Sequence, residues 1–201
     1  MTADPENLLQ EARAGDAATL GQLLESYRRY LALLARVQIG QRLQGKVDAS
    51  DLVQETFLEA HRNFGRFQGS SEGQLVSWLR QILAAKLADL MRRYLGTQGR
   101  DVRLEREIEI AFDRSSVMLG QGLIAPHSSP SHQAQRREQA VILADALQEL
   151  PDDYREVIVL RHLEGLTFPE VARRMGRTLD SVEKLWMRAL ARLRQALGDQ
   201  P

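Results

Sequence analysis

The sequence of 201 residues contains no cysteine. Disulfide bonds and thiolate metal sites are therefore excluded, and a reducing compartment, the cytoplasm, is the expected location. Aromatic residues make up only 5% of the chain, and no segment alternates β-branched or aromatic residues with polar ones as a half-buried strand does. Leu, Ala, Arg, Glu and Gln dominate instead, so the expected fold is all-α.

The chain also lacks a long apolar run and a net charge of either sign. No stretch approaches the roughly 18 apolar residues of a membrane span, and residues 1–9 do not resemble a signal peptide, so no membrane association is expected. The 27 basic residues balance the 27 acidic ones, which gives no general sign of nucleic-acid binding. Basic residues nevertheless outnumber acidic ones in residues 173–194. This segment is either a nucleic-acid-binding surface or an ordinary solvated helix face.

The first block of the chain, up to about residue 94, contains three or four amphipathic segments. Apolar residues recur at helical spacing in residues 8–14, 17–38, 49–66 and 74–94. Asp48 or Ser50 is placed to cap the third segment, and Gly65 and Gly69 interrupt the pattern after it. We therefore predict a small helical domain over residues 1–97.

Periodicity decays between the two blocks. Residues 98–133 contain repeated Gly, Pro and Ser, together with a charged stretch, residues 100–114, that could be transiently helical. We interpret residues 98–133 as a flexible linker. The alternative is a weakly patterned helical element that packs on the first domain.

The second block, residues 134–201, carries clear helix boundaries. A helix is expected to begin after Pro151 and to stop at Gly165. Residues 167–170 have the capping-box pattern, with Thr167 and Glu170 at its ends. A short helix should follow and end at Gly176, and Thr178 can cap a last helix that runs to about residue 197.

A short helix, a tight turn and a longer basic helix form a helix-turn-helix, which presents its second helix to the major groove of DNA. In the last helix, Val182, Trp186, Ala189, Leu193 and Leu197 share the inner face by their spacing. The candidate DNA-contacting residues are Arg173, Arg174, Arg177, Thr178, Ser181, Lys184, Arg188 and Arg192. A helical hairpin that binds no DNA could carry the same caps.

Two stretches of the chain resemble a known family. Residues 147–176, from Leu147 to Gly176, closely resemble region four of the sigma-70 family of RNA polymerase subunits. Residues 48–61, 64–71, 77–80 and 88–93 resemble region two of the same family. Because region two is followed directly by a linker and region four, the resemblance is to the extracytoplasmic-function (ECF) subgroup. It implies two small helical domains, residues 1–97 and 134–201, joined by the linker over residues 98–133.

The resemblance implies partners and roles for the first block. Core RNA polymerase and promoter DNA are the expected partners, with the beta-prime clamp and the beta flap as docking points, and an anti-sigma factor is a further candidate. Residues implied to bind the polymerase are Asp48, Asp51, Leu52, Gln54, Glu55 and Leu58. Residues implied to bind and open the downstream promoter element are Gln68, Gly69, Ser70, Ser71, Trp78, Arg80, Lys86, Arg92 and Arg93.

Residue chemistry supports part of this assignment. The loop of residues 68–73 offers small polar groups and free backbone amides that suit an unstacked base. Trp78 is either a wall of that pocket or a core residue, since it shares a helical stripe with Leu75 and Leu79. The basic residues are either phosphate contacts or solvated surface residues.

No catalytic residue, cofactor or metal ion is expected. Residues 69–73 match the nucleophile-elbow pattern and residues 120–125 a dinucleotide-binding pattern, but both patterns require a preceding strand, and none is predicted. His61, His127, His132 and His162 lack metal-ligand spacing. The main alternative function is a stand-alone helix-turn-helix regulator, and the third is a helical scaffold that binds no DNA.

Overall fold

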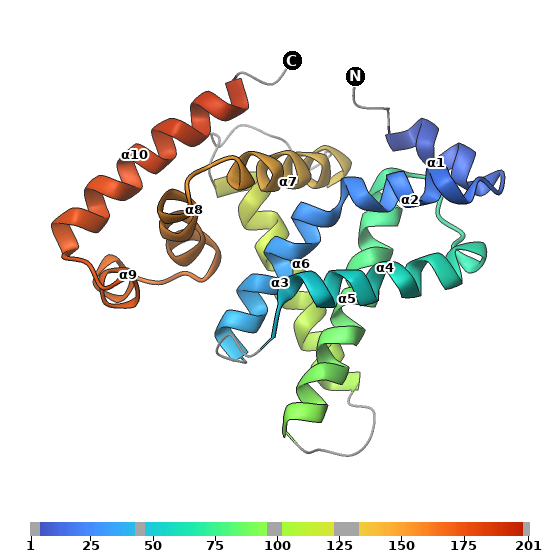
Figure 1. Ribbon diagram of the computed structural model, residues 1–201, viewed down its shortest axis with the longest axis horizontal. Helices are drawn as coiled ribbons and strands as arrows, with labels where there is room; N and C mark the ends of the chain where they lie inside the picture. The colour runs from blue at the N-terminus through green and yellow to red at the C-terminus, as the bar shows by residue number, and fades with distance from the viewer. Residues whose placement is uncertain (1–4, 43–46, 96–101, 123–132, 199–201) are drawn as a thin grey trace. The chain divides into compact units, whose positions relative to one another are not determined.

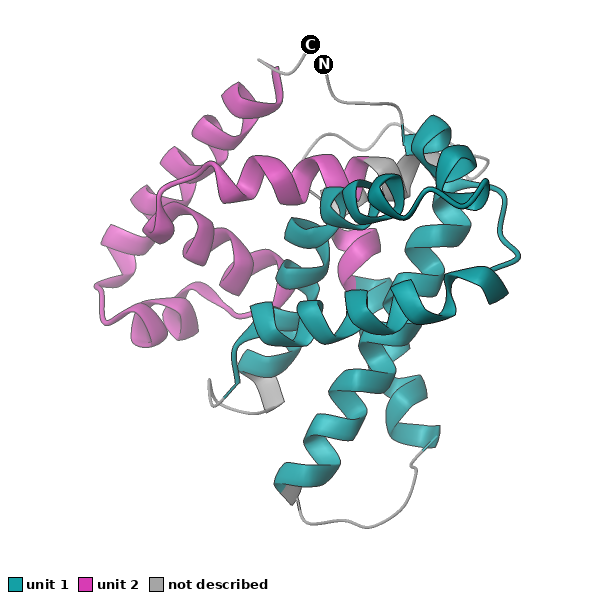
Figure 2. Ribbon diagram, turned by 45° about the vertical axis from the view of Figure 1, so that its right-hand side comes forward, with its two compact units in different colours: residues 1–114 teal, residues 115–201 magenta. Residues whose placement is uncertain are grey.

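A computed structural model describes residues 5–42, 47–95, 102–122 and 133–198. Within these ranges the chain forms ten α-helices and no strand (Figure 1), as predicted. The chain divides into two compact units, residues 1–114 and 115–201 (Figure 2), so the expectation of two small helical domains is confirmed. The boundary between the units falls inside one helix.

In its described residues, the first unit contains five helices before that boundary helix. They are α1 (Pro5–Arg13), α2 (Ala17–Ser26), α3 (Arg28–Arg42), α4 (Ala49–Asn63) and α5 (Glu72–Leu95). Helix α4 contacts both α3 and α5. Apolar side chains at helical spacing meet in one core, whose largest fully buried members include Leu31, Leu34, Leu79, Leu83 and Leu87.

Two aspartates fix where helices α2 and α4 begin. Asp16 accepts hydrogen bonds from the amides of Ala18 and Thr19, at 2.9 and 3.3 Å, and from the Thr19 hydroxyl. These donors lower the pKa of Asp16, the Thr19 hydroxyl first among them. Asp48 accepts from the Ser50 amide at 2.8 Å, so Asp48 rather than Ser50 is the cap of α4.

The predicted helical segment over residues 17–38 is broken at Tyr27 into α2 and α3. Tyr27 has φ −98° and ψ 0°, outside the helical region, and its side chain is almost fully buried. Its hydroxyl donates to Glu72, at the start of α5, at 3.0 Å. Hydrophobic periodicity continues through the break because Tyr27 is itself a core residue, so the sequence pattern did not reveal it.

Helix α6 (Val102–Gly122) lies within the segment expected to be a flexible linker. Ile108 and Phe112 are completely buried. The linker interpretation is therefore wrong over residues 102–122, and the alternative of a helical element packed on the first domain is correct for residues 102–114, which belong to the first unit. Residues 98–101 and 123–132 of the expected linker lie outside the described residues.

The second unit contains α7 (Gln133–Gln148), α8 (Asp152–Ile158), a π-helical turn (Val159–Leu163), α9 (Phe168–Met175) and α10 (Leu179–Gly198). Gly165 and Gly176 have φ values of 73° and 63°, in the left-handed region that favours glycine. Both predicted stops are confirmed. Pro151 precedes α8, also as predicted.

Candidate functional site

The helix-turn-helix of the second unit consists of α9, the turn at Gly176 and α10. At the start of α9, the Thr167 amide and hydroxyl both donate to the Glu170 carboxylate, at 2.7 and 2.6 Å, which lowers the pKa of Glu170. Both halves of the predicted capping box are present: the Thr167 side chain accepts from the Glu170 amide, and the Glu170 side chain accepts from the Thr167 amide. At the start of α10, the Thr178 hydroxyl accepts from the Ser181 amide at 3.3 Å.

The inner face of α10 is held by the preceding helices. Val182, Ala189 and Leu193 are buried. Trp186 Nε1 donates to His162 Nε2 at 3.0 Å, and the two rings are stacked 5.9 Å apart. Burial, followed by the nearby Arg161 guanidinium, lowers the pKa of His162. Neutral His162 is therefore the form that accepts the indole hydrogen bond.

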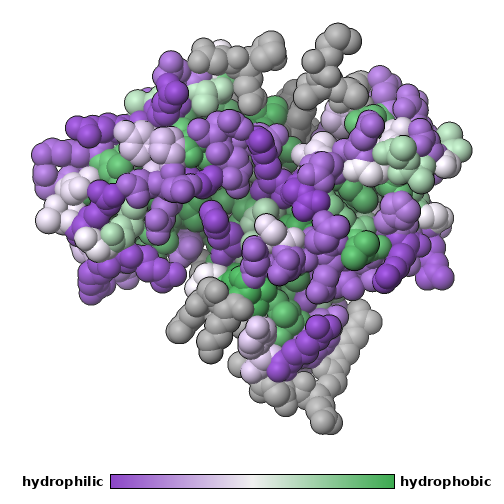
Figure 3. Space-filling view, viewed as in Figure 1, coloured by the Kyte–Doolittle hydropathy of each residue, from purple (hydrophilic) through white to green (hydrophobic). Residues whose placement is uncertain are grey.

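The outer face of α10 is basic and exposed. Lys184, Arg188 and Arg192 are exposed as predicted, and Ser181 is half-buried. Figure 3 shows mainly hydrophilic residues over α9 and α10, at the left of the view. Further predicted contacts Arg173, Arg174, Arg177 and Thr178 are all exposed.

Ion pairs within the second unit offset part of this positive charge. Lys184 pairs with Asp180 one helical turn earlier, at 2.8 Å, and Arg177 pairs with Asp153. Both ion pairs are exposed, so water screens them. Lys184 and Arg177 can therefore exchange their aspartate partners for DNA phosphates.

Helix α4 presents the second candidate surface. Asp51, Gln54, Glu55 and Leu58 are exposed along one side, and the Leu58 side chain is 50% exposed. Leu52 is 3% exposed and packs in the core, so its assignment as a polymerase contact is corrected. Its spacing from the buried Val53 and Thr56 places it on the inner face of α4.

Arg28 reaches this surface from the start of α3. Its guanidinium donates to Gln54 at 3.1 Å and to Glu25 at 2.6 Å, and lies 5.0 Å from the centre of the Phe57 ring. Gln54 is therefore positioned by a neighbouring helix. Arg28 was not predicted from the sequence, because no pattern indicated that the start of α3 lies beside α4.

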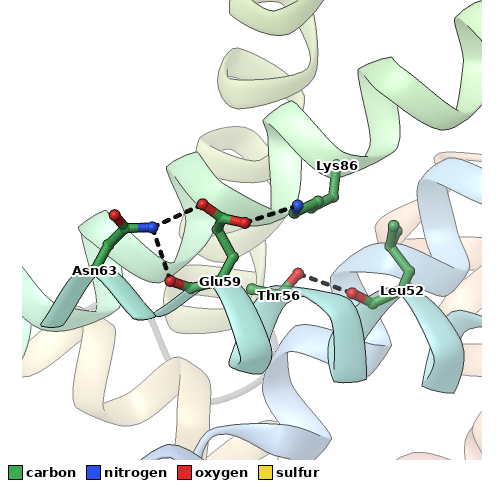
Figure 4. Close-up of polar contacts among 5 residues, drawn as sticks. All are labelled: Leu52, Thr56, Glu59, Asn63 and Lys86. Carbon is green, nitrogen blue, oxygen red and sulfur yellow. Dashed lines mark hydrogen bonds and ion pairs between the residues drawn. The ribbon is translucent and has the colours of Figure 1, made fainter. Parts of the chain in front are cut away.

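Helices α4 and α5 are joined by a polar network around Glu59 (Figure 4). Lys86 on α5 donates to Glu59 at 3.0 Å, and Asn63 donates to both the carboxylate and the backbone carbonyl of Glu59. These contacts, Lys86 first, lower the pKa of Glu59. The buried Thr56 hydroxyl donates to the Leu52 carbonyl at 2.8 Å. The predicted phosphate contact Lys86 is thus paired within the first unit.

The loop before α5 is arranged by Gln74 and Arg13. Gln74 Oε1 accepts from the Ser70 and Ser71 amides at 2.7 and 3.2 Å, and Arg13 donates to the Gly69 carbonyl at 2.8 Å. These two amides are therefore engaged, which corrects the expectation of free amides at Ser70 and Ser71. Gln68 and Ser70 are exposed, while Gly69 and Ser71 are partly exposed.

Three aromatic side chains cluster beside this loop. Phe67 stacks on Trp78 with ring centres 5.0 Å apart, and Phe64 lies 5.9 Å from Phe67 and 6.3 Å from Trp78. Phe67 and Trp78 are both partly exposed, so Trp78 is neither a fully buried core residue nor a fully free ring. Phe67 was not predicted as a site residue. It is an aromatic residue between the predicted helical segments 49–66 and 74–94, and this position could have indicated a role in the loop.

Two of the four basic residues on α5 that were predicted to contact DNA form ion pairs with residues of α6. Arg80 is 6% exposed, donates to the Tyr30 hydroxyl at 3.4 Å and pairs with Asp113 at 2.8 Å, so its assignment as a phosphate contact is corrected. Arg92 pairs with Asp89 and, at 3.7 Å, with Glu105. Arg93 is exposed.

Among the described residues, no group of three or more His, Asp or Glu side chains could hold a metal ion. In the same residues, no helix is both long enough and apolar enough to cross a membrane. His127 and His132 lie outside the described residues.

Comparison with known proteins gives two family matches in the same order as the two units. Residues 23–95 match sigma-70 region 2, and residues 140–193 match sigma-70 region 4, together more than half of the chain. The ECF RNA polymerase sigma-E factor of Haemophilus influenzae is 29% identical over 182 residues, which are 90% of this chain and 89% of that protein. The ECF RNA polymerase sigma factor BldN of Streptomyces coelicolor is 30% identical over 194 residues, which are 96% of this chain and 65% of that protein.

The solved structure of CnrH in complex with the cytosolic domain of CnrY is also similar in sequence. It is 25% identical, the match covers 98% of this chain and 100% of that chain, and the TM-score is 0.34.

Proposed function

Since the chain belongs to the sigma-70 family of RNA polymerase sigma factors, in its ECF subgroup, we propose that its two units divide promoter recognition between them. As a sigma factor it binds core RNA polymerase and promoter DNA for the initiation of transcription. The observation that carries this conclusion is the presence of both regions, in order, in two separate helical units. A stand-alone regulator would need only the helix-turn-helix.

For the first unit, the proposed polymerase contact is the exposed side of α4. Asp51 and Glu55 supply negative charge, Leu58 supplies an apolar centre, and Arg28 holds Gln54 between them. An apolar centre with charged surroundings is the usual composition of a protein interface. Leu52 contributes by packing α4 onto the unit and not by contact.

Opening of the downstream element is assigned to the loop before α5 and its aromatic cluster. Phe67 and Trp78 are partly exposed and stacked, and base–aromatic stacking holds an unpaired base without sequence preference. Gln68, Gly69, Ser70 and Ser71 lie in the same loop, while Lys86, Arg92 and the exposed Arg93 remain candidate phosphate contacts from α5. The polymerase carries out the chemistry, and this chain contributes no catalytic group.

The second unit is assigned to the upstream element. Helix α10 presents Lys184, Arg188 and Arg192 to the groove, with Arg173, Arg174 and Arg177 beside it for the backbone phosphates. Thr178 and Ser181, at the start of α10, are suited to phosphate or base contacts. An anti-sigma factor remains a proposed regulatory partner, since members of the family are often held inactive by one.

The docking assignment can be tested by titrating the fluorescently labelled chain with core polymerase. The double variant Asp51→Asn, Glu55→Gln should bind about tenfold more weakly, a loss of about 1.4 kcal/mol. The control Glu11→Gln, Glu107→Gln removes the same charge from exposed positions on α1 and α6 and should bind normally. Equal affinities for both double variants would reject the α4 surface. A wild-type chain that binds duplex DNA but not core polymerase would reject the function.

A further inference from the structure

Met187 is an exposed apolar side chain in the middle of the recognition helix α10. Its side chain is 60% exposed, whereas the inner face of the helix is buried at Val182, Ala189 and Leu193. Isolated exposed apolar residues are common on protein surfaces. The position of Met187 on the helix is what makes it informative.

Met187 lies on the outermost line of α10. Asp180, Lys184, Met187 and Ala191 follow one another at intervals of four, three and four residues, which places them on one helix face, and all four are exposed. This face is opposite the buried one. A helix that enters the major groove with its inner face held by the protein therefore brings Met187 towards the base pairs.

The neighbours of Met187 leave it as the central apolar contact on that line. Lys184 and Asp180 pair with each other at 2.8 Å, so their charges are partly offset. Arg188, the next residue along the chain, is exposed and can reach a phosphate or a guanine. Ala191 is small and does not hold the helix away from the bases.

The major groove offers only one apolar group to such a side chain. Base edges there are hydrogen-bond donors and acceptors, except for the 5-methyl group of thymine. An unbranched thioether is flexible and polarizable and can pack against a methyl group. Next to a polar base edge, the same side chain would lose water without gaining a partner.

We propose that Met187 is a specificity residue that reads a thymine in the upstream promoter element by packing against its 5-methyl group. This inference rests on the proposed function of the second unit. It predicts that the element contains a thymine, on one of the two strands, opposite the middle of α10.

The test is run-off transcription with core polymerase on a promoter used by this chain. Thymines of the upstream element are replaced singly by uracil, which lacks only the 5-methyl group. At one thymine, wild-type initiation at subsaturating protein should fall about fourfold, which corresponds to about 0.8 kcal/mol for one buried carbon group. Met187→Ala and Met187→Gln should initiate equally well on the thymine and uracil templates.

Met118→Ala is the matched control, because Met118 is an exposed methionine on α6, 40% exposed and outside the recognition helix. It should respond to uracil as the wild type does. The inference is overturned if the wild type is insensitive to every uracil, if the element has no thymine, or if Met187→Ala retains the full uracil effect. Failure of the proposed function is distinct, since the wild type would then not initiate on any template.

Discussion

Gly69 is the residue at which the loop before α5 approaches an aromatic ring most closely. A β-carbon built on Gly69 would lie 2.2 Å from Cζ of Phe67 and 2.9 Å from Cβ of Gln74. No real β-carbon approaches another atom so closely, so only glycine fits while Phe67 stays stacked on Trp78. The glycine thus preserves the aromatic cluster proposed to hold an unpaired base.

Substitution Gly69→Ala should therefore displace the Phe67 ring and lower the free energy of unfolding of the first unit by about 1–3 kcal/mol. Urea unfolding followed by Trp78 fluorescence, in a Trp186→Phe background, measures this loss. The control is Gly65→Ala, because a β-carbon at Gly65 meets nothing within 4 Å. Unchanged stability and Trp78 emission in Gly69→Ala would contradict the packing described here.

His162 gives the second unit a predictable response to pH. Its pKa is lowered by burial and by Arg161, so the folded state resists a proton that the unfolded state accepts below about pH 6.5. The contribution of neutral His162 is fully present above that pH and is lost as the pH falls through the lower folded pKa. Urea unfolding of a Trp78→Phe variant, followed by Trp186 fluorescence, should give lower stability at pH 5.5 than at pH 7.5.

The variant His162→Gln keeps a hydrogen-bond acceptor for Trp186 without a group that titrates near neutral pH. The loss of stability between pH 7.5 and 5.5 should therefore be smaller than in the parent protein. A loss of the same size in both proteins would mean that groups other than His162 account for the pH dependence. Glu164 is not one of them, because burial raises its pKa and the folded state therefore gains stability from its protonation as the pH falls.

Among the helices, those of the second unit were predictable because glycine, proline and capping residues mark their ends. Gly165 and Gly176 have the positive φ values that the sequence implied, and α10 begins after Thr178 as expected. The candidate contacts on α10 follow from helical spacing alone, and the structure confirms their exposure at Lys184, Arg188 and Arg192.

The first unit was harder to predict because polar residues occupy core positions. Arg80 lies at core spacing between the buried Val76 and Leu83, which is a signal of burial that its charge obscured. Its partner Asp113 is 33 residues away, on a helix that composition suggested was a linker. Local hydrophobic periodicity cannot predict an ion pair between residues so far apart in the sequence.

Helix α6 should depend on Arg80 for its position. The variant Arg80→Met keeps an apolar side chain but loses the bonds to Tyr30 and Asp113, which should lower the free energy of unfolding by about 1–3 kcal/mol. Hydrogen exchange at the amides of residues 105–114 should become faster. Asp113→Asn is the milder comparison, because the Asp113 side chain is 64% exposed. Fast exchange of these amides already in the wild type would show that α6 is not packed on the unit.

Two leucines on α4 should have different roles, Leu52 in packing and Leu58 in binding. Leu52→Ala removes a buried side chain and should cost about 2–5 kcal/mol of stability. Leu58→Ala removes a half-exposed side chain and should leave stability within about 1 kcal/mol, while binding to core polymerase weakens severalfold. The measurements are urea unfolding of both variants and their titration with core polymerase. Normal binding of Leu58→Ala to core polymerase would remove Leu58 from the interface.

Over the whole molecule, zero net charge conceals two surfaces of opposite charge. The exposed side of α4 carries Asp51 and Glu55. Helices α9 and α10 carry most of the arginine and lysine residues between positions 173 and 194. An acidic surface does not attract DNA, and a basic one does, so this separation fits the proposed polymerase contact on α4 and the proposed upstream-element contact on α9 and α10. Composition alone could not show this, since the two surfaces cancel in the sum.

The most direct test of this account is run-off transcription with purified core polymerase on a pool of promoter fragments, with and without the full chain. We predict initiation at discrete start sites only when the chain is present, and loss of these products with the Asp51→Asn, Glu55→Gln variant but not with the Glu11→Gln, Glu107→Gln control. Absence of chain-dependent products, while the same chain shifts duplex DNA on its own, would contradict the account.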